Sequence, residues 1–237
     1  MKYHPIVTLC GLFPTLLSAQ VVFSDNFNIS NGPDGAWTSL NGQVWAVTNQ
    51  TYYTTSSLTN AFNKANGVTF VDGVVSAQVM VDSGPHVDGG LFVRGNGVTG
   101  NIENGVIFVA MDGDIYFHVV VGGAWGGPLG SVLLTSLLPG DLRNLSGSGF
   151  TMTVNVSGNS YTGTISDLAG TTIYGSTSYT DTAFTYTSGD VGLYSNSSNI
   201  RFDNYSVTAV PEPSTYAALF GLAALGFAGY RRRQMKC

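Results

Sequence analysis

The sequence predicts an all-β protein built as a two-sheet antiparallel jelly-roll sandwich, and three observations support this fold class. Charged residues make up 10% of the 237 residues while 31 are glycine, a composition that excludes coiled coils and long-helix proteins. Aromatic residues reach 12%, which argues against a disordered chain. Apolar and polar residues alternate with period two at several places, the pattern of half-buried strands.

The first 19 residues have the layout of a secretory signal peptide. Lys2 supplies a positive charge, residues 6–17 form an apolar core, and Ser18-Ala19 offers a small-residue cleavage site. The alternative is a first buried strand or helix of the domain, interrupted by Pro14. The signal-peptide interpretation predicts export and assigns the folded domain to residues 20–209.

Strands are expected along the whole of that domain. Alternation is clearest at residues 75–82, 150–157 and 161–166, and the Gly158-Asn159 pair suits a two-residue hairpin between the last two. Further strands are expected at residues 21–27, 44–49, 90–94, 105–110, 115–121, 171–178, 190–194 and 200–208. Short strands separated by turns, without a repeat, predict one two-sheet sandwich.

Several phrases of the domain resemble the concanavalin A-like jelly rolls, the group that includes laminin-G-like and lectin-type domains. Residues 23–27 (FSDNF) are similar to the first strand of that group, and residues 89–94 (GGLFVR) to its central strand. The closing phrases at 190–194 (DVGLY) and 200–207 (IRFDNYSV) are the most specific. The resemblance implies a single jelly roll whose first and last strands are neighbours.

Residues 210–237 combine three features in a fixed order. These are the tripeptide Pro211-Glu212-Pro213, an uncharged apolar stretch at 216–230, and the cluster Arg231, Arg232 and Arg233. The prolines end the preceding strand. The apolar stretch predicts a single hydrophobic helix, short for a bilayer, with the arginines on the cytoplasmic side.

This arrangement resembles the PEP-CTERM sorting signal of Gram-negative bacteria. The resemblance implies that the helix lies transiently in the inner membrane, that an exosortase-type membrane protease recognises the motif, and that the protein is released to the cell surface or the extracellular matrix. A plain C-terminal membrane anchor is the alternative. The resemblance carries no information about what the domain itself does.

The domain is acidic and contains no cysteine. Residues 20–210 hold four basic and 13 acidic side chains, while Cys10 and Cys237 lie outside this range. An acidic surface repels phosphate backbones, so nucleic acid is a poor partner. Neither a disulfide nor a cysteine-based metal site can stabilise the domain.

Catalytic motifs are missing from the sequence. The domain has a single glutamate, Glu103, so it lacks the Glu-x-Asp-x-x-Glu pattern of laminarinase-like enzymes on this fold. Asp112-Gly113-Asp114 is interpreted as a turn, and His118 as an ordinary strand residue. The sequence therefore predicts a protein that is not an enzyme, although an aspartate pair contributed by separate strands stays open.

Sugar binding needs exposed aromatic rings and polar side chains that bond hydroxyl groups. Trp125, in the glycine-rich segment 122–127, is the best candidate, and Trp37, Tyr53 and Arg94 are the others. A role in the core or at an edge is the alternative for Trp37.

No cofactor is required by any motif, but a structural Ca²⁺ is considered. Asp25 and Asp203 are expected on the neighbouring first and last strands, and Ca²⁺ prefers such oxygen ligands. Hydrogen bonds that cap the strand ends are the alternative.

On these grounds we expect an exported bacterial surface or matrix protein whose non-catalytic, lectin-like sandwich binds polysaccharide or associates with an exopolysaccharide (biofilm) matrix. Two alternatives stay open. One is an unusual or degenerate glycoside hydrolase or lyase on the same fold, and the other is a structural matrix protein without a discrete ligand.

Overall fold

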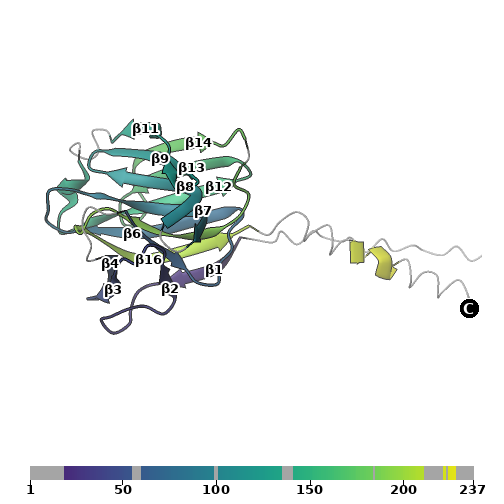
Figure 1. Cartoon of the computed structure of the whole chain (residues 1–237), viewed down its shortest axis with the longest axis horizontal. Coiled ribbons are helices and arrows are strands. Elements are labelled where there is room, and N and C mark those ends of the chain that lie inside the picture. The colour runs from purple at the N-terminus through teal and green to yellow at the C-terminus, as the bar shows by residue number, and fades with distance from the viewer. Residues whose placement is uncertain are drawn as a thin grey trace, which may run out of the picture.

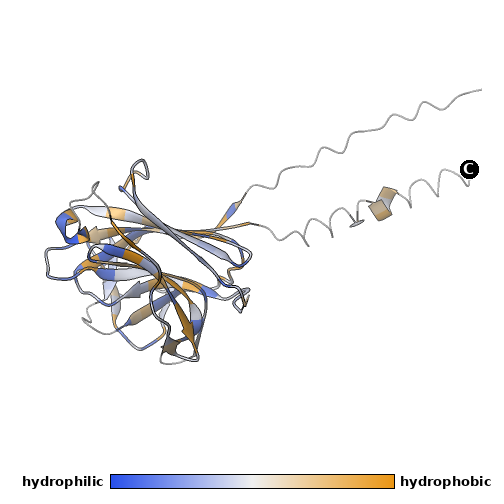
Figure 2. Cartoon of the chain, turned by 90° about the horizontal axis from the view of Figure 1, so that it is seen from above, coloured by the Kyte–Doolittle hydropathy of each residue, from blue (hydrophilic) through white to orange (hydrophobic). Residues whose placement is uncertain are grey.

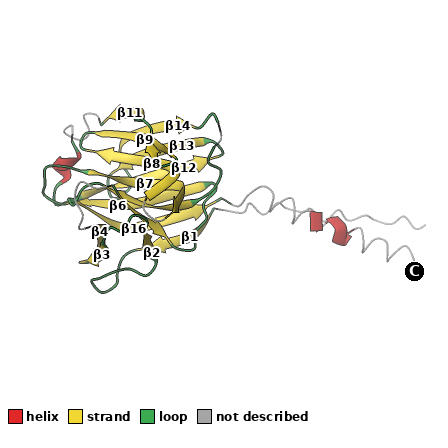
Figure 3. Ribbon diagram, in the orientation of Figure 1, coloured by secondary structure: helices red, strands yellow, loops and turns green. Residues whose placement is uncertain are grey.

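The computed structural model describes residues 19–54, 60–98, 101–134, 141–183, 185–210, 221–222 and 224–227. Within these ranges the chain forms two antiparallel sheets, each of eight strands, packed face to face in a jelly-roll-like fold (Figure 1, Figure 3). The all-β, two-sheet prediction is confirmed.

We call the two layers sheet A and sheet B. Sheet A has the order β14 (Ile173–Thr180), β13 (Ser160–Ser166), β12 (Gly149–Ser157), β6 (Gly73–Val81), β16 (Ile200–Ala209), β4 (Thr51–Thr54) and β3 (Trp45–Thr48), with β1 (Gln20–Asp25) also paired to β16. Sheet B has the order β10 (Ala124–Trp125), β9 (Asp114–Val121), β8 (Asn101–Met111), β7 (Asp88–Val98), β15 (Asp190–Ser195), β5 (Ala61–Ala65) and β2 (Trp37–Ser39), with β11 (Leu129–Leu133) paired to β9. A short 3₁₀ helix, η1 (Leu142–Leu145), precedes β12.

Alternation builds sheet A as the sequence predicts. Along β6 every second residue from Gly73 to Val81 is buried, and the residues between them are partly exposed. β12 continues the pattern, because Val154 pairs with Val75 on the inner face and Thr153 pairs with Ser76 on the outer face. Gly158, in the left-handed region at φ 58°, helps to form the expected turn into β13.

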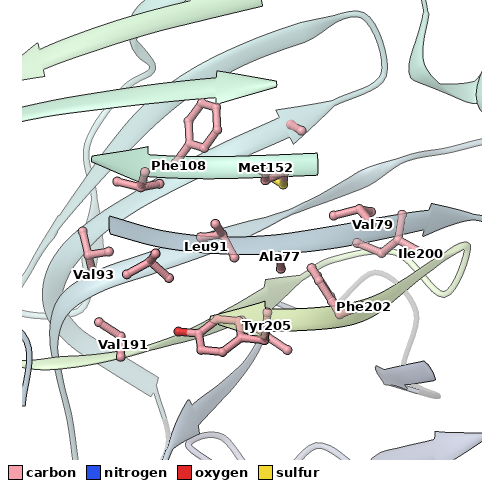
Figure 4. Close-up of a cluster of buried hydrophobic side chains, with 14 of the residues drawn as sticks. Ala77, Val79, Leu91, Val93, Phe108, Met152, Val191, Ile200, Phe202 and Tyr205 are labelled. Carbon is pink, nitrogen blue, oxygen red and sulfur yellow. The ribbon is translucent and has the colours of Figure 1, made fainter. Parts of the chain in front are cut away.

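The main core lies between the two sheets. Ala77, Val79 and Met152 of sheet A and Leu91 and Phe108 of sheet B are all nearly inaccessible to solvent, and Figure 4 shows these side chains in one cluster. Burying such side chains supplies most of the driving force for folding.

The first and last strands of the domain are neighbours, as expected. β1 pairs antiparallel with β16 from Gln20 opposite Ala209 to Asp25 opposite Tyr205. The chain therefore enters and leaves the sandwich at the same end (Figure 1).

Residues 221–222 and 224–227 are helical, and the side chains of Leu225 and Phe227 are exposed. The ribbon of this short segment is partly orange in Figure 2. Among the described residues no helix is long and apolar enough to cross a membrane. Most of the expected signal peptide lies outside the described residues, and so do Pro211, Glu212, Pro213, Arg231, Arg232 and Arg233.

Candidate functional site

The outer face of sheet B, which points away from the main core, is apolar. It carries a second cluster of buried residues, namely Leu40, Phe62, Phe92, Ile102, Ile107, Val109, Tyr116, Val120 and Tyr194, with Met111 and Trp125 packed against them. Strands β7, β8 and β9 are consequently buried on both faces. Met111 and Trp125 are only partly buried, so this apolar layer reaches the surface at these two residues.

Trp125 packs against the outer side of this cluster. Its ring centroid lies 5.8 Å from that of Phe62, 5.6 Å from that of Tyr194 and 5.1 Å from that of His118. Tyr116 extends the row, with its ring 5.1 Å from that of His118. We call these five residues the aromatic face. Trp125 and His118 are half-buried and the other three are buried, so the first two offer ring surface to a ligand.

The loop that carries Trp125 is held by hydrogen bonds. The Nδ1 atom of His118 lies 2.7 Å from the carbonyl oxygen of Gly126, and the amide of Gly126 donates to Val119. Gly122 and Gly123 turn the chain between β9 and β10 with positive φ angles of 57° and 78°, which glycine adopts without steric cost. The sequence and the backbone thus fix Trp125 over the sheet.

Polar groups lie at the border of the aromatic face. The Tyr194 hydroxyl donates to Oδ1 of exposed Asn60 at 3.0 Å. Burial, followed by nearby Asp88, raises the pKa of Tyr194 well above its usual range and that of Tyr116 to about 12. Both phenols therefore stay neutral, and their hydrogens are donated within the protein, that of Tyr194 to Asn60 and that of Tyr116 to the sulfur of Met111.

Beside the aromatic face, three titratable residues form what we call the acid cluster: Asp88, His86 and Asp112. The Nδ1 atom of His86 lies 3.0 Å from Oδ2 of Asp112, and its Nε2 atom lies 3.7 Å from Oδ2 of Asp88. Asn196 donates to the same Asp88 oxygen at 2.9 Å. Asp88 is 4% exposed, and its Oδ1 atom has no hydrogen-bond partner among the described residues. Burial raises the pKa of the Asp88 carboxyl.

The structure places only Trp125, of the predicted sugar contacts, in this site. Trp37 is 6% exposed and packs among Phe23, Phe27 and Tyr205 at the end of the core, so the alternative core role describes its position. Tyr53, partly exposed, projects from β4 on sheet A, where the Arg201 guanidinium lies 4.3 Å from its ring centroid.

Arg94 differs from the expectation of an exposed sugar contact. It is 2% exposed, and its guanidinium donates to the carbonyl oxygens of Val71, Gly158 and Tyr186 and pairs with Asp72 at 2.6 Å. These bonds satisfy a buried charge, as burial requires. The side chain ties β7 to the turn between β12 and β13 and is a structural residue.

The charge of Asp25 acts on Asp203, but Asp25 already accepts hydrogen bonds from other groups. Its Oδ1 atom accepts from the amide of Phe27 and its Oδ2 atom from the indole of Trp37, both at 2.8 Å. Burial, followed by the charge of Asp25, raises the pKa of Asp203. Among the described residues no group of three or more His, Cys, Asp or Glu side chains is arranged to hold a metal ion. The contacts present are those of the hydrogen-bonding alternative.

Comparison with known families identifies the C-terminal segment. Residues 209–233 match the model of the PEP-CTERM protein-sorting motif. The chain carries this motif, as the sequence predicts. No curated protein matches the chain.

Solved structures resemble the domain in fold. A protein of unknown function with a galectin-like fold from Bacillus subtilis has a TM-score of 0.56 at 12% identity, covering 80% of this chain and 96% of its own. The carbohydrate-binding module CBM66 from the same organism has a TM-score of 0.50 at 13% identity, covering 73% and 92%. The catalytic domain of an endo-1,3-beta-glucanase (laminarinase) from Thermotoga petrophila RKU-1 has a TM-score of 0.52 at 12% identity, covering 82% and 99%. At this identity the likeness concerns the fold alone.

Most of the site is not evident in the sequence. The three segments that carry His86 with Asp88, Asp112, and Tyr194 are brought together by the pairing of β7 with β8 and with β15. One signal was available, since residues 105–110 and 115–121 are apolar without strict alternation, the pattern of strands covered on both faces.

Proposed function

We propose that this chain is an exported surface or matrix protein whose β-sandwich binds polysaccharide at the aromatic face and has no catalytic role. The observation that carries the proposal is the position of Trp125, a half-buried indole held over three other rings and bordered by Asn60 and the Tyr194 hydroxyl. Pyranose rings stack on such indoles, while amide and phenol groups bond their hydroxyls.

Two further facts support the proposal. The PEP-CTERM motif belongs to exported proteins, and polysaccharides are the abundant polymers outside the cell. The fold is also that of a carbohydrate-binding module at 13% identity, so the architecture is compatible with such a role.

The test is binding of the full chain to an array of bacterial and plant glycans. Trp125→Ala should weaken binding by about tenfold or more, because a central aromatic anchor carries a large share of binding energy. Tyr53→Ala is the matched control, since Tyr53 is an aromatic residue on the outer face of sheet A. Equal binding by wild type and Trp125→Ala would refute the proposed site.

Sorting is the second part of the proposal. An exosortase-type membrane protease would recognise the motif at 209–233 while the apolar helix holds the chain in the inner membrane. Glu212→Ala, or glutamine at Arg231, Arg232 and Arg233, should leave synthesis unchanged and retain full-length protein in the membrane. Release of either variant into the medium with the wild-type rate and C-terminus would contradict this part.

A second function, glycoside hydrolysis, is favoured by one observation. Asp88 and Asp112 are two carboxyl groups on separate segments, both in contact with His86, and burial raises the pKa of Asp88 as expected for a general acid. Release of reducing sugar from a glycan that binds, abolished by Asp88→Asn, would establish this function in place of simple binding.

A further inference from the structure

A pocket lies between the edges of the two sheets, on the side of the sandwich formed by β2 and β3, and we call it the edge pocket. These are the last strands of sheet B and sheet A on that side, and Figure 1 shows them at the bottom of the domain, opposite β11 and β14 at the top. The pocket has a volume of about 260 Å³, and Ser39, Trp45, Tyr52 and Asn63 are among the residues that line it. Val44, another lining residue, is 61% exposed, so the pocket opens to solvent.

The strands turn these lining side chains toward one another. In sheet A, Trp45 of β3 and Tyr52 of β4 occupy buried positions of alternating strands. In sheet B, Ser39 of β2 pairs with Asn63 of β5. The Asn63 amide donates to the Tyr52 hydroxyl at 2.6 Å, which links the two sheets beside the pocket. The edge pocket therefore has one wall from each sheet.

Three buried polar atoms of the lining residues lack partners. Among the described residues, six buried side-chain nitrogen or oxygen atoms have no hydrogen-bond partner, and Ser39 Oγ, Trp45 Nε1 and Asn63 Oδ1 are three of them. Trp45 and Asn63 are more than nine-tenths buried, at 4% and 1% exposed. Each unsatisfied group costs free energy, and native proteins rarely leave such groups unpaired. Their concentration around one pocket indicates an occupant that forms hydrogen bonds.

The chemistry of the lining favours a neutral occupant rich in hydroxyl groups. The indole of Trp45 only donates, the carbonyl of Asn63 only accepts and the hydroxyl of Ser39 does both, so groups that donate and accept satisfy all three. The described lining residues include no lysine or arginine, and their one charged group is the carboxylate of Asp34, which disfavours anionic ligands. A quaternary ammonium ion suits aromatic rings and a carboxylate, but it forms no hydrogen bonds and leaves all three atoms unsatisfied.

We propose that the edge pocket binds one neutral sugar ring, either a free monosaccharide or the end ring of a neutral polysaccharide. Its volume of about 260 Å³ holds roughly eight or nine water molecules at about 30 Å³ each, which suits a single ring and not a chain. Sugar hydroxyls donate to Asn63 Oδ1, accept from Trp45 Nε1 and do either with Ser39 Oγ. The edge pocket lies between the sheets, whereas Trp125 lies on the outer face of sheet B, so this inference goes beyond the proposed function.

The test uses the tryptophans of the protein as reporters. The chain has three tryptophans, so Trp125→Phe leaves Trp37 and Trp45, both of which line the edge pocket. This full-length variant, in a detergent without sugar headgroups, is titrated in the millimolar range with glucose, galactose, mannose and fructose, and with choline as a cationic probe. At least one sugar should change the tryptophan emission in a saturable way, and choline should not.

Two serine variants in the Trp125→Phe background locate the sugar. Ser39→Ala removes one unpartnered hydroxyl and should weaken binding of that sugar about fivefold, the typical effect of one hydrogen bond. Ser76→Ala is the matched control, because Ser76 is a partly exposed serine on the outer face of sheet A, and it should leave the titration unchanged. If Ser39→Ala does not fold, the titration of Trp125→Phe alone decides.

Emission that none of the four sugars changes would overturn the inference and assign the edge pocket to water, while polysaccharide binding that depends on Trp125 would stand. A response to choline and to no sugar would overturn it in favour of a cation site. An affinity that Ser39→Ala leaves unchanged, or that Ser76→Ala lowers as much, would place the sugar elsewhere. Sugar binding in the edge pocket together with unchanged glycan binding by Trp125→Ala would support this inference and refute the proposed site at the aromatic face.

Discussion

The outer faces of the two sheets differ although the same fold builds both. On sheet A one row of paired residues reads Ser176, Thr164, Thr153, Ser76 and Ser206 from strand to strand. The corresponding row on sheet B reads Tyr116, Val109, Gly90, Tyr194 and Phe62. The residues of the first row are polar and at least partly exposed, whereas those of the second row are mostly apolar and buried.

This difference explains why Trp125 lies where it does. Hydroxyl side chains stay hydrated on an open sheet, so sheet A needs no further layer. Removing the aromatic and aliphatic side chains of sheet B from water stabilises the fold by about 25 cal/mol for each Å² of apolar surface. Trp125 packs against these buried side chains, and its half-buried ring is where we propose that the ligand binds.

The largest loss of stability is expected from aspartate substitutions at neighbouring residues of one strand. These substitutions test whether the outer faces of the two sheets differ in burial. On sheet A, Val154→Asp should unfold the domain and Thr153→Asp should not, because only Val154 is buried. On sheet B, Val106→Asp and Ile107→Asp should both unfold it, since each is 0% exposed. An unpaired buried charge costs several kcal/mol against a total stability of about 5–15 kcal/mol.

Chemical denaturation of the four variants measures this. A tolerated Ile107→Asp would mean that the outer face of sheet B is open to water, and the comparison would be lost. If Thr153→Asp destabilised the domain as much as Val154→Asp, the outer face of sheet A would be buried as well.

Alanine substitutions of Arg94 and Arg201 compare the stability contributed by a buried arginine with that of an arginine on an outer face. Arg94→Ala should destabilise the domain by about 3–5 kcal/mol, because three carbonyl groups and Asp72 lose the buried donor that they share. Arg201→Ala, which removes a partly exposed pair with Asp82 on sheet A, should cost about 1 kcal/mol or less. Similar losses in urea unfolding would contradict the structural role of Arg94.

A smaller change in stability, which depends on pH, is expected from the substitution Asp88→Asn. Because burial raises its pKa, the folded state keeps this proton to higher pH than the unfolded chain does. Its contribution to stability is therefore present at acid pH and is lost as the pH rises from the ordinary aspartate value through the folded pKa. Asp88→Asn, which cannot ionise, should melt a few degrees above wild type near neutral pH and nearer to it in acid.

Melting curves of both proteins across this pH range check the sign. His86, Asp112, Tyr194 and Tyr116 face Asp88 in the folded state and are present in both proteins. A difference in melting temperature that grows as the pH falls would show that Asp88 is stabilised as the anion.

The smallest effect is expected from calcium removal. Both Asp25 oxygens already accept hydrogen bonds, so chelation with EDTA should leave the melting temperature unchanged. A fall on chelation, reversed by calcium and reduced in Asp203→Asn, would instead establish an ion between the first and last strands.

Much of sheet A could be predicted from the sequence, and less of sheet B. Strict alternation at β6, β12 and β13 gives the strand, its register and its buried face together. β5 (Ala61–Ala65) escaped prediction because alanine, asparagine and lysine have low strand propensity, and pairing to β15 and β2 overrides it.

The candidate site was foreseen only at Trp125, from the glycines around it. Arg94 was misplaced because a charged side chain is expected at the surface, and its burial depends on carbonyl groups from distant segments. The contacts of His86 with Asp88 and Asp112 likewise join a loop residue to the first residue of β7 and to a turn, an arrangement that no local pattern specifies.

The most direct test of the account uses the tryptophan fluorescence of the protein itself. Of its three tryptophans, Trp37 and Trp45 are 6% and 4% exposed, while Trp125 is half-buried. Acrylamide should therefore quench Trp125 preferentially, and an oligosaccharide bound at the aromatic face should protect it. We predict protection in wild type and none in Trp125→Phe. A bound glycan that leaves the quenching of Trp125 unchanged would show that the ligand occupies another surface.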